Sequence, residues 1–241
     1  MDLNPAFAAR GCFVTGTDTE VGKTRVSAAL LHWCATQGWR SAGYKPVAAG
    51  LECVDGQWIN TDVQALRLAS SLPLSDAQVC PSPFRAACAP HIAAELEGRR
   101  IAFDPLLQGA RDLAAQADAL VVEGVGGFVV PLDAEHDTAD LAQALGLPVV
   151  LVVGLRLGCL NHALLTAESV RARGLRLAAW VGNTVDPAMP WVEANLATLR
   201  QRLGAEFGAV ALGHVARLAD PTPQAVLAHL DPAGLQQLFA A

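Results

Sequence analysis

The sequence is short of lysine. Its 241 residues include 17 lysines and arginines together, and only Lys23 and Lys45 are lysine. In a chain that otherwise uses arginine, a retained lysine indicates a position that needs a compact ammonium on a flexible stem rather than a planar guanidinium. Both lysines are therefore candidate functional residues. The alternative for Lys45 is a solvated charge at the end of a strand.

Concentrated positive charge and long apolar runs are also absent. The basic residues are scattered, the net charge is −6 and the pI is near 5.4, so we expect no nucleic-acid partner. No apolar stretch reaches membrane-spanning length, and no basic segment followed by a long apolar one marks the N-terminus for export. This composition favours an acidic cytoplasmic enzyme without a membrane partner.

Cysteine pairs with metal-binding spacing are missing as well. The chain has six cysteines but no Cys-x-x-Cys pair and no histidine at ligand spacing from one, which argues against structural zinc. We expect all six to be reduced, buried thiols. They are Cys12, Cys34, Cys53, Cys80, Cys88 and Cys159.

Short apolar runs alternate with longer helical patterns along the whole chain, without a linker or an internal repeat. This alternation predicts an α/β fold, and runs that are apolar on both faces are typical of a covered parallel sheet. The expected strands are 12–15, 41–45, 119–123, 149–154, 178–183 and 209–213. The expected helices are 23–37, 62–69, 106–116, 138–145, 161–173, 191–203 and 223–230.

The segment GTDTEVGKT at residues 16–24 joins the first expected strand to the first expected helix. Its glycines let backbone N–H groups face phosphate oxygens, Lys23 can reach the terminal phosphates, and the Thr24 hydroxyl can ligate Mg²⁺. The segment is therefore predicted to bind a nucleoside triphosphate. Five residues separate its two glycines rather than four, and one of them is Glu20, so we expect a specialised version of the loop.

Two carboxylates are candidates for the same metal. Glu123 ends an apolar strand and enters a turn with glycines at 124, 126 and 127, which indicates close backbone approach to a bound group. Asp62 opens a helix. With Thr24 they would supply the few oxygen ligands that Mg²⁺ takes from protein. The alternatives are a solvated strand-end charge for Glu123 and a helix N-cap for Asp62.

Five segments, in order along nearly the whole chain, resemble the dethiobiotin synthetases. They are TGTDTEVGKT (15–24), GYKPV (43–47), PHI (90–92), VEGVGG (122–127) and GLRLGCLNHA (154–163). The last is the most specific. The resemblance implies one P-loop NTPase domain over residues 1–241, with a mostly parallel sheet flanked by helices on both faces.

The resemblance also implies an activity. Such an enzyme joins CO₂ to 7,8-diaminopelargonate and closes a ureido ring, converting ATP to ADP and phosphate with Mg²⁺ as cofactor. The implied catalytic residues are Lys45, which holds the carbamate and the mixed anhydride, Lys23 on the transferring phosphoryl group, and Thr19. Enzymes of this kind are homodimers with the substrate site at the subunit interface.

Further site residues follow from the same resemblance. The ATP contacts are Glu20, Val21, Gly22, Lys23, Thr24, Arg25, Asp62, Glu123, Gly124, Val125, Gly126, Asn183, Thr184, Ala216, Arg217 and Leu218. The substrate contacts are Thr19, Lys45, Ala49, Val125, Gly126, Leu157, Gly158, Cys159, Leu160 and Asn161, the last five receiving the substrate carboxylate at a helix N-terminus. Without the resemblance, Asn161 reads as an ordinary N-cap, and His91 and His162 as structural histidines.

The sequence departs from the family pattern at three places. Ala49 stands where serine is usual, Asn183-Thr184 where Asn-Asp is usual, and the segment 216–218 where Pro-Trp-Leu is usual. These changes concern a substrate hydroxyl contact and the nucleotide base rather than the phosphate chemistry.

Three other functions are open to a chain with this loop. A dimeric regulatory ATPase of the partitioning or septum-positioning kind carries a lysine near the start of the loop, where this chain has Thr17, and usually a basic or amphipathic element. A synthetase of the cobyrinate-amidating kind needs a glutaminase domain. A pure nucleotide-binding scaffold leaves the two lysines unexplained.

Overall fold

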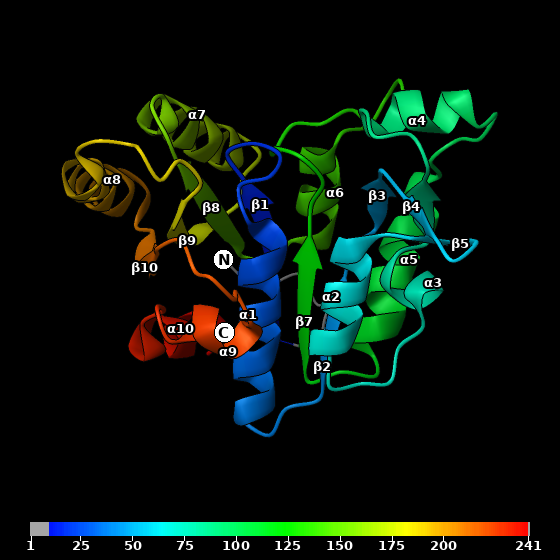
Figure 1. Cartoon of the computed structure of the whole chain (residues 1–241), viewed down its shortest axis with the longest axis horizontal. Helices are drawn as coiled ribbons and strands as arrows, with labels where there is room; N and C mark the ends of the chain where they lie inside the picture. The colour runs from blue at the N-terminus through cyan, green and yellow to red at the C-terminus, as the bar shows by residue number, and fades with distance from the viewer. Residues whose placement is uncertain (1–9, 241) are drawn as a thin grey trace.

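The computed structural model describes residues 10–240, and its centre is a six-stranded sheet (Figure 1). The strand order is β10-β9-β8-β1-β7-β2, and every neighbouring pair is parallel. Its strands are β1 (Arg10–Gly16), β2 (Ser41–Tyr44), β7 (Ala119–Glu123), β8 (Val149–Leu155), β9 (Leu177–Thr184) and β10 (Val210–Val215). The α/β fold and all six expected strands are confirmed.

The sheet is parallel because its strands are apolar on both faces. Every residue of β7 and β8 is buried, which only a sheet covered by helices on both sides allows. On one side α1 (Lys23–Thr36) packs against α2 (Thr61–Ala69) and α9 (Pro223–Leu227). The remaining long helices pair as α5 (Phe103–Ala114) with α6 (Thr138–Leu145), and α7 (Cys159–Ala172) with α8 (Val192–Phe207) (Figure 1).

The expected helices exist, but several begin or end elsewhere. Helix α5 begins before Pro105 rather than after it, because a proline in the first turn removes an N–H that has no intrahelical partner. Helix α7 begins at Cys159 with Gly158 as its N-cap in the left-handed conformation, so the interpretation of Asn161 as the N-cap is wrong. Helix α8 extends to Phe207, and Gly208 ends it.

Several short elements were not expected. Parallel strands β3 (Val47–Ala49) and β6 (Ser82–Phe84) form a second sheet, and β4 (Glu52–Val54) and β5 (Gln57–Ile59) form an antiparallel hairpin. Three helices were also missed: α3 (Asp76–Val79), α4 (Pro90–Leu96) and α10 (Pro232–Phe239).

The cysteine expectation is partly wrong. Four cysteines are buried, but Cys53 lies on the exposed hairpin and Cys88 on an exposed turn. Burial raises the pKa of the Cys34 and Cys80 thiols to about 12, which keeps them protonated. Among the described residues, no helix has the length and apolar character needed to cross a bilayer.

The parallel sheet brings the predicted polar segments to one edge. The loop at 16–24 follows β1, Lys45 follows β2, Glu123 ends β7 and Thr184 ends β9. Because the strands are parallel, these carboxyl ends meet at the same edge, where ligands bind in folds of this class.

The unexpected helix α10 is part of the core, and its contribution can be measured. Phe239 is buried and stacks on Trp33 of α1 with ring centroids 5.2 Å apart. We expect Phe239→Ala to lower the free energy of unfolding by about 3–5 kcal/mol, because it leaves a cavity in the packed interior. Urea unfolding followed by tryptophan fluorescence measures the change.

The matched control is Gln236→Ala on the exposed face of the same helix, which should alter the free energy of unfolding by less than about 0.5 kcal/mol. Equal stability of the two variants would contradict the assignment of α10 to the core.

Candidate functional site

The glycine-rich segment 16–24, called the P-loop below, links β1 directly to α1 as predicted. Lys23 is the first residue of α1 and is only 6% exposed, and its Nζ donates to the backbone oxygen of Asp18 at 2.9 Å. The Lys23 ammonium therefore folds back onto the P-loop and bonds to a backbone carbonyl. A bound nucleotide can replace that carbonyl with its phosphate oxygens as the hydrogen-bond acceptors.

The P-loop is held in place by β8 and β9. The Thr17 hydroxyl accepts from the backbone N–H of Gly154 at 3.2 Å, and Arg156 forms an ion pair with Asp18. Asn183, near the end of β9, donates from Nδ2 to the backbone oxygen of Val21 at 2.8 Å. None of these bonds was expected from the sequence.

Gly22 shows why the loop needs its second glycine. Its φ is +94°, and a Cβ there would lie 2.3 Å from Nδ2 of Asn183. Both the backbone conformation and the close approach of β9 exclude a side chain.

Beside the P-loop lies a cluster of two carboxylates and an ammonium, of which Glu123 and Lys45 are buried and Asp62 is partly exposed. Glu123 is 0% exposed, and its Oε1 accepts from Lys45 Nζ at 2.6 Å and from the Thr24 hydroxyl at 2.8 Å. Lys45 is 4% exposed and also contacts Asp62 Oδ2 at 3.1 Å. The interpretations of Lys45 and Glu123 as solvated strand-end charges are both wrong.

Asp62 is not the N-cap of α2. That position belongs to Asn60, whose side chain accepts from the backbone N–H of Val63 at 3.1 Å. Asp62 lies in the first turn, free to direct its carboxylate toward Lys45.

The cluster changes the protonation of its members. Burial alone would lower the pKa of Lys45, but Glu123 and Asp62 more than offset it, and the net pKa is raised. Burial would raise the pKa of Asp62, yet the neighbouring Lys45 ammonium makes it lower than usual. Burial lowers the pKa of Lys23 to about 8, against the opposing effect of Glu123.

A cavity of about 620 Å³ opens above this cluster. Fifteen predicted site residues line it: Thr19, Glu20, Gly22, Lys23, Thr24, Arg25, Lys45, Ala49, Asp62, Val125, Gly126, Asn183, Thr184, Arg217 and Leu218. Val185, Ala219 and Pro221 also line it and were not predicted, although each lies within a few residues of a predicted position.

The other predicted residues do not line this cavity. Glu123 lies beneath it through its bonds to Thr24 and Lys45, and Val21 is buried within the P-loop. Gly124 and Ala216 are also outside the lining. So is the segment 157–161 at the start of α7, where Leu157 is 95% exposed.

The glycines that follow Glu123 have reasons within the protein itself. A Cβ on Gly124 would lie 3.2 Å from the ring of Phe13, and Gly126 has a φ of +64°. Close approach to a bound group, which the sequence suggested, therefore stays a prediction.

At the end of the cavity beside β9, Thr184 bonds to a histidine of the neighbouring strand. The Thr184 hydroxyl and Nε2 of His214 lie 2.8 Å apart. Burial lowers the pKa of His214, which favours the neutral ring. Asn183, whose rotamer is fixed by its bond to Val21, lies next to this pair.

The donor set suits a hard cation. Glu123 Oε2 is buried and has no hydrogen-bond partner among residues 10–240, and Thr24 and Asp62 add oxygen atoms beside it. No group of three or more His, Cys, Asp or Glu side chains in the described part of the chain could hold a metal alone. Two carboxylates and a hydroxyl match Mg²⁺, which takes its other ligands from phosphate and water.

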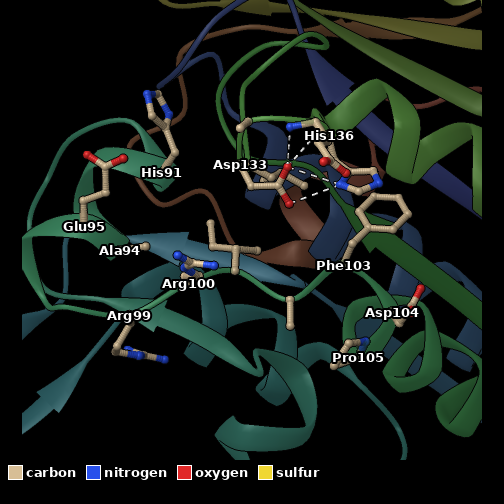
Figure 2. A pocket seen from close by; sticks show the side chains of 15 residues that line it. His91, Ala94, Glu95, Arg99, Arg100, Phe103, Asp104, Pro105, Asp133 and His136 are labelled. Atoms are coloured by element: carbon tan, nitrogen blue, oxygen red, sulfur yellow. Dashed lines mark hydrogen bonds and ion pairs between the residues drawn. The ribbon is translucent and has the colours of Figure 1, made fainter.

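A larger hollow of about 890 Å³ lies elsewhere, between α4, the segment leading into α5 and the turn before α6 (Figure 2). His136 pairs with Asp133 at 3.1 Å and stacks on Phe103, and Arg100 and His91 lie opposite them (Figure 2). None of the predicted site residues is in its lining. Size alone therefore does not identify the active site, because the predicted nucleotide-binding residues line the smaller cavity beside the P-loop.

Comparison with known proteins identifies the family to which this chain is similar. The family model described as an AAA domain matches residues 10–225. The chain is 52% identical over 224 residues to the ATP-dependent dethiobiotin synthetase BioD of Ralstonia nicotianae, covering 93% of this chain and 96% of that protein. The MinC:MinD cell division complex of Aquifex aeolicus is 11% identical with a TM-score of 0.50, covers 96% of this chain and 93% of the other, and shows the fold alone.

The lowered pKa of Lys23 predicts a pH dependence of nucleotide binding. Below pH 8 Lys23 is charged in the ligand-free protein, and above pH 8 it is increasingly neutral. Because phosphate binds the charged form, nucleotide binding above pH 8 should take up about one proton, and affinity should fall by up to about tenfold per pH unit. Calorimetry in buffers of different ionisation enthalpy measures the uptake.

Lys23→Met is the control, since it should bind weakly and without the proton uptake above pH 8. Binding by the unaltered protein at pH 9 without proton uptake would contradict the lowered pKa.

Proposed function

The chain belongs to the family of the ATP-dependent dethiobiotin synthetases, which makes it an ATP-dependent ligase, and on that premise we propose its substrates, chemistry and site residues. The substrates are 7,8-diaminopelargonate, CO₂ and ATP, and the products are dethiobiotin, ADP and phosphate. The observation that carries this proposal is the buried Lys45 beside the P-loop cavity, linked to Glu123 and Asp62.

The reaction has three steps. One substrate amine adds to CO₂ and loses a proton, which gives a carbamate. A carbamate oxygen attacks the γ-phosphorus of ATP, and ADP leaves with the pair of electrons of the broken P–O bond. The second amine then attacks the carbonyl carbon of the mixed anhydride, and phosphate leaves as the ureido ring closes.

The two lysines supply positive charge where these steps develop negative charge. Lys23 turns from the Asp18 carbonyl to the β- and γ-phosphates, and Lys45 faces the carbamate and then the anhydride. Thr19, on the wall of the cavity, positions the carbamate together with the backbone of Val125 and Gly126. Catalysis in this proposal depends on positioning and charge.

Thr24, Asp62 and Glu123 are the residues that would hold Mg²⁺. The bound ion neutralises charge on the phosphates. The support for this assignment is the unpaired Oε2 of Glu123, together with the Thr24 hydroxyl that donates to Oε1 of the same carboxylate.

The nucleotide base lies at the β9 end of the cavity in this proposal. The bond to Val21 uses one N–H of the Asn183 amide and leaves its Oδ1 and second N–H for the base. Thr184, Arg217 and Leu218 complete the base contacts.

The substrate carboxylate binds at the start of α7 of a second subunit. Gly158 has no side chain to cap this helix, and the N–H of Cys159 donates to the backbone oxygen of Arg156 at 3.0 Å, which leaves the N–H groups of Leu160 and Asn161 for an anion. We propose a cytoplasmic homodimer of single-domain chains with the segment 157–161 across the interface. The exposure of Leu157 supports an interface there. The regulatory ATPase alternative has in its favour only a shared fold.

Product analysis tests the proposed reaction. We expect phosphate release from ATP and Mg²⁺ only when 7,8-diaminopelargonate and bicarbonate are both present, with a product of the mass of dethiobiotin. Release that ignores the diamine would identify a switch ATPase or a different substrate.

Substitution of the two lysines should separate binding from chemistry. Lys45→Gln should lower turnover by about 100-fold or more, because it removes the cation from the developing charge. At saturating magnesium, its affinity for ATP should stay within about twofold of the unaltered protein, a difference of well under 1 kcal/mol. The measurements are steady-state phosphate release and calorimetric titration with ATP.

Lys23→Gln is the comparison, because it should lose nucleotide binding as well as turnover. Thermal unfolding checks that both variants fold. Normal turnover by a folded Lys45→Gln variant would remove Lys45 from the mechanism.

A further inference from the structure

Lys45 contacts the same carboxylates that are assigned above to the metal. Its Nζ lies 2.6 Å from Glu123 Oε1 and 3.1 Å from Asp62 Oδ2. The same Oε1 accepts from the Thr24 hydroxyl at 2.8 Å. The ammonium therefore occupies the position from which one cation can contact both carboxylates at once.

A divalent cation and this ammonium compete for the same two carboxylates. Mg²⁺ holds its oxygen ligands at about 2.0–2.1 Å, and two cations on one carboxylate oxygen repel each other. If the metal bound through the free Oε2 of Glu123, the divalent ion and the Lys45 ammonium would still contact the same carboxylate. Repulsion between the two cations therefore favours the departure of the ammonium when the metal binds.

We infer that Lys45 is a stand-in cation: in the metal-free protein its ammonium neutralises Glu123 and Asp62, and it moves off them into the cavity when a divalent cation binds. This inference rests on the proposed function, in which the same lysine later faces the carbamate. It adds an order of events, because Lys45 becomes available to the carbamate only after the metal has bound.

The burial of Glu123 explains why a stand-in is needed. A fully buried carboxylate without a cation is strongly destabilising, and among residues 10–240 only Lys45 forms an ion pair with Glu123. Lys23, whose Nζ bonds to the Asp18 carbonyl, does not replace Lys45 there.

The cavity provides the place to which Lys45 moves. Lys45 and Asp62 are both in its lining, so the flexible stem of the lysine can turn from the carboxylates toward the ligand without unfolding any strand. In the ligand-free protein both lysines thus bond to acceptors of the protein itself, and different ligands release them: phosphate for Lys23, the metal for Lys45.

The scarcity of lysine makes the inference directly observable. Protein labelled with ¹³C and ¹⁵N in lysine alone contains two labelled side chains, Lys23 and Lys45. We expect a non-hydrolysable ATP analogue with EDTA to shift the Lys23 side-chain signal and leave Lys45 in place. Addition of Mg²⁺ should then shift the Lys45 signal. The variant Lys23→Met assigns the two signals.

The outcomes of this titration are distinct. A Lys45 signal that stays unchanged at saturating Mg²⁺, or that moves fully with the analogue and EDTA, overturns the inference. No diamine is present, so either result leaves the proposed reaction standing. If the analogue fails to shift Lys23 as well, nucleotide binding itself, and with it the proposed function, is contradicted.

Metal affinity gives a second, independent measurement. Mn²⁺ binding without nucleotide, followed by the electron paramagnetic resonance of the free ion, should be about tenfold or more tighter for Lys45→Met than for the unaltered protein, because the competing ammonium is gone. Lys23→Met is the matched control and should gain much less. Equal or weaker Mn²⁺ binding by folded Lys45→Met overturns the inference, and the labelled unaltered protein decides the matter if that variant does not fold.

Discussion

The fully buried carboxylate of Glu123 ends β7, the strand next to the edge strand β2, and its charge constrains the residues around it. Removing one partner of such a buried pair typically costs about 3–5 kcal/mol. The partner Lys45 comes from the end of β2, and Thr24 from the start of α1. The strand order β1-β7-β2 is what brings these three segments together, so the topology of the sheet and the charge balance of the site depend on each other.

Much of the fold could be predicted because its central strands are buried on both faces. Uninterrupted apolar runs such as β8 leave little doubt about a parallel sheet. The hairpin of β4 and β5 carried a usable signal that was missed, since Asp55-Gly56 is a preferred two-residue turn and both residues have positive φ. The pairing of β3 with β6 had no such signal, because three-residue strands far apart in the chain leave no pattern.

The site could be predicted where residues sit at strand ends, and not where distant loops meet. Lys45 and Glu123 follow apolar strands, and in a parallel sheet those ends share an edge. Arg156 pairs with Asp18 although the two residues are far apart in the sequence, and no sequence pattern predicts that they meet. The bond between Asn183 and Val21 could not be predicted for the same reason. Asp62 contacts Lys45, and its role as a metal ligand stays a prediction. The sequence did not reveal that Asn60, rather than Asp62, caps the helix, because both residue types suit that position.

The hairpin lies in the chain between Ala49 and Asp62, two residues on the wall of the cavity. Asn60 Nδ2 reaches the backbone oxygen of Gly50 at 3.5 Å, which closes the base of the hairpin, and its turn at Asp55-Gly56 is exposed. Exposed turns with closed bases tolerate added residues. The tip of this hairpin is therefore the natural attachment point for a dye or an inserted peptide, which would report on the neighbouring cavity without entering it.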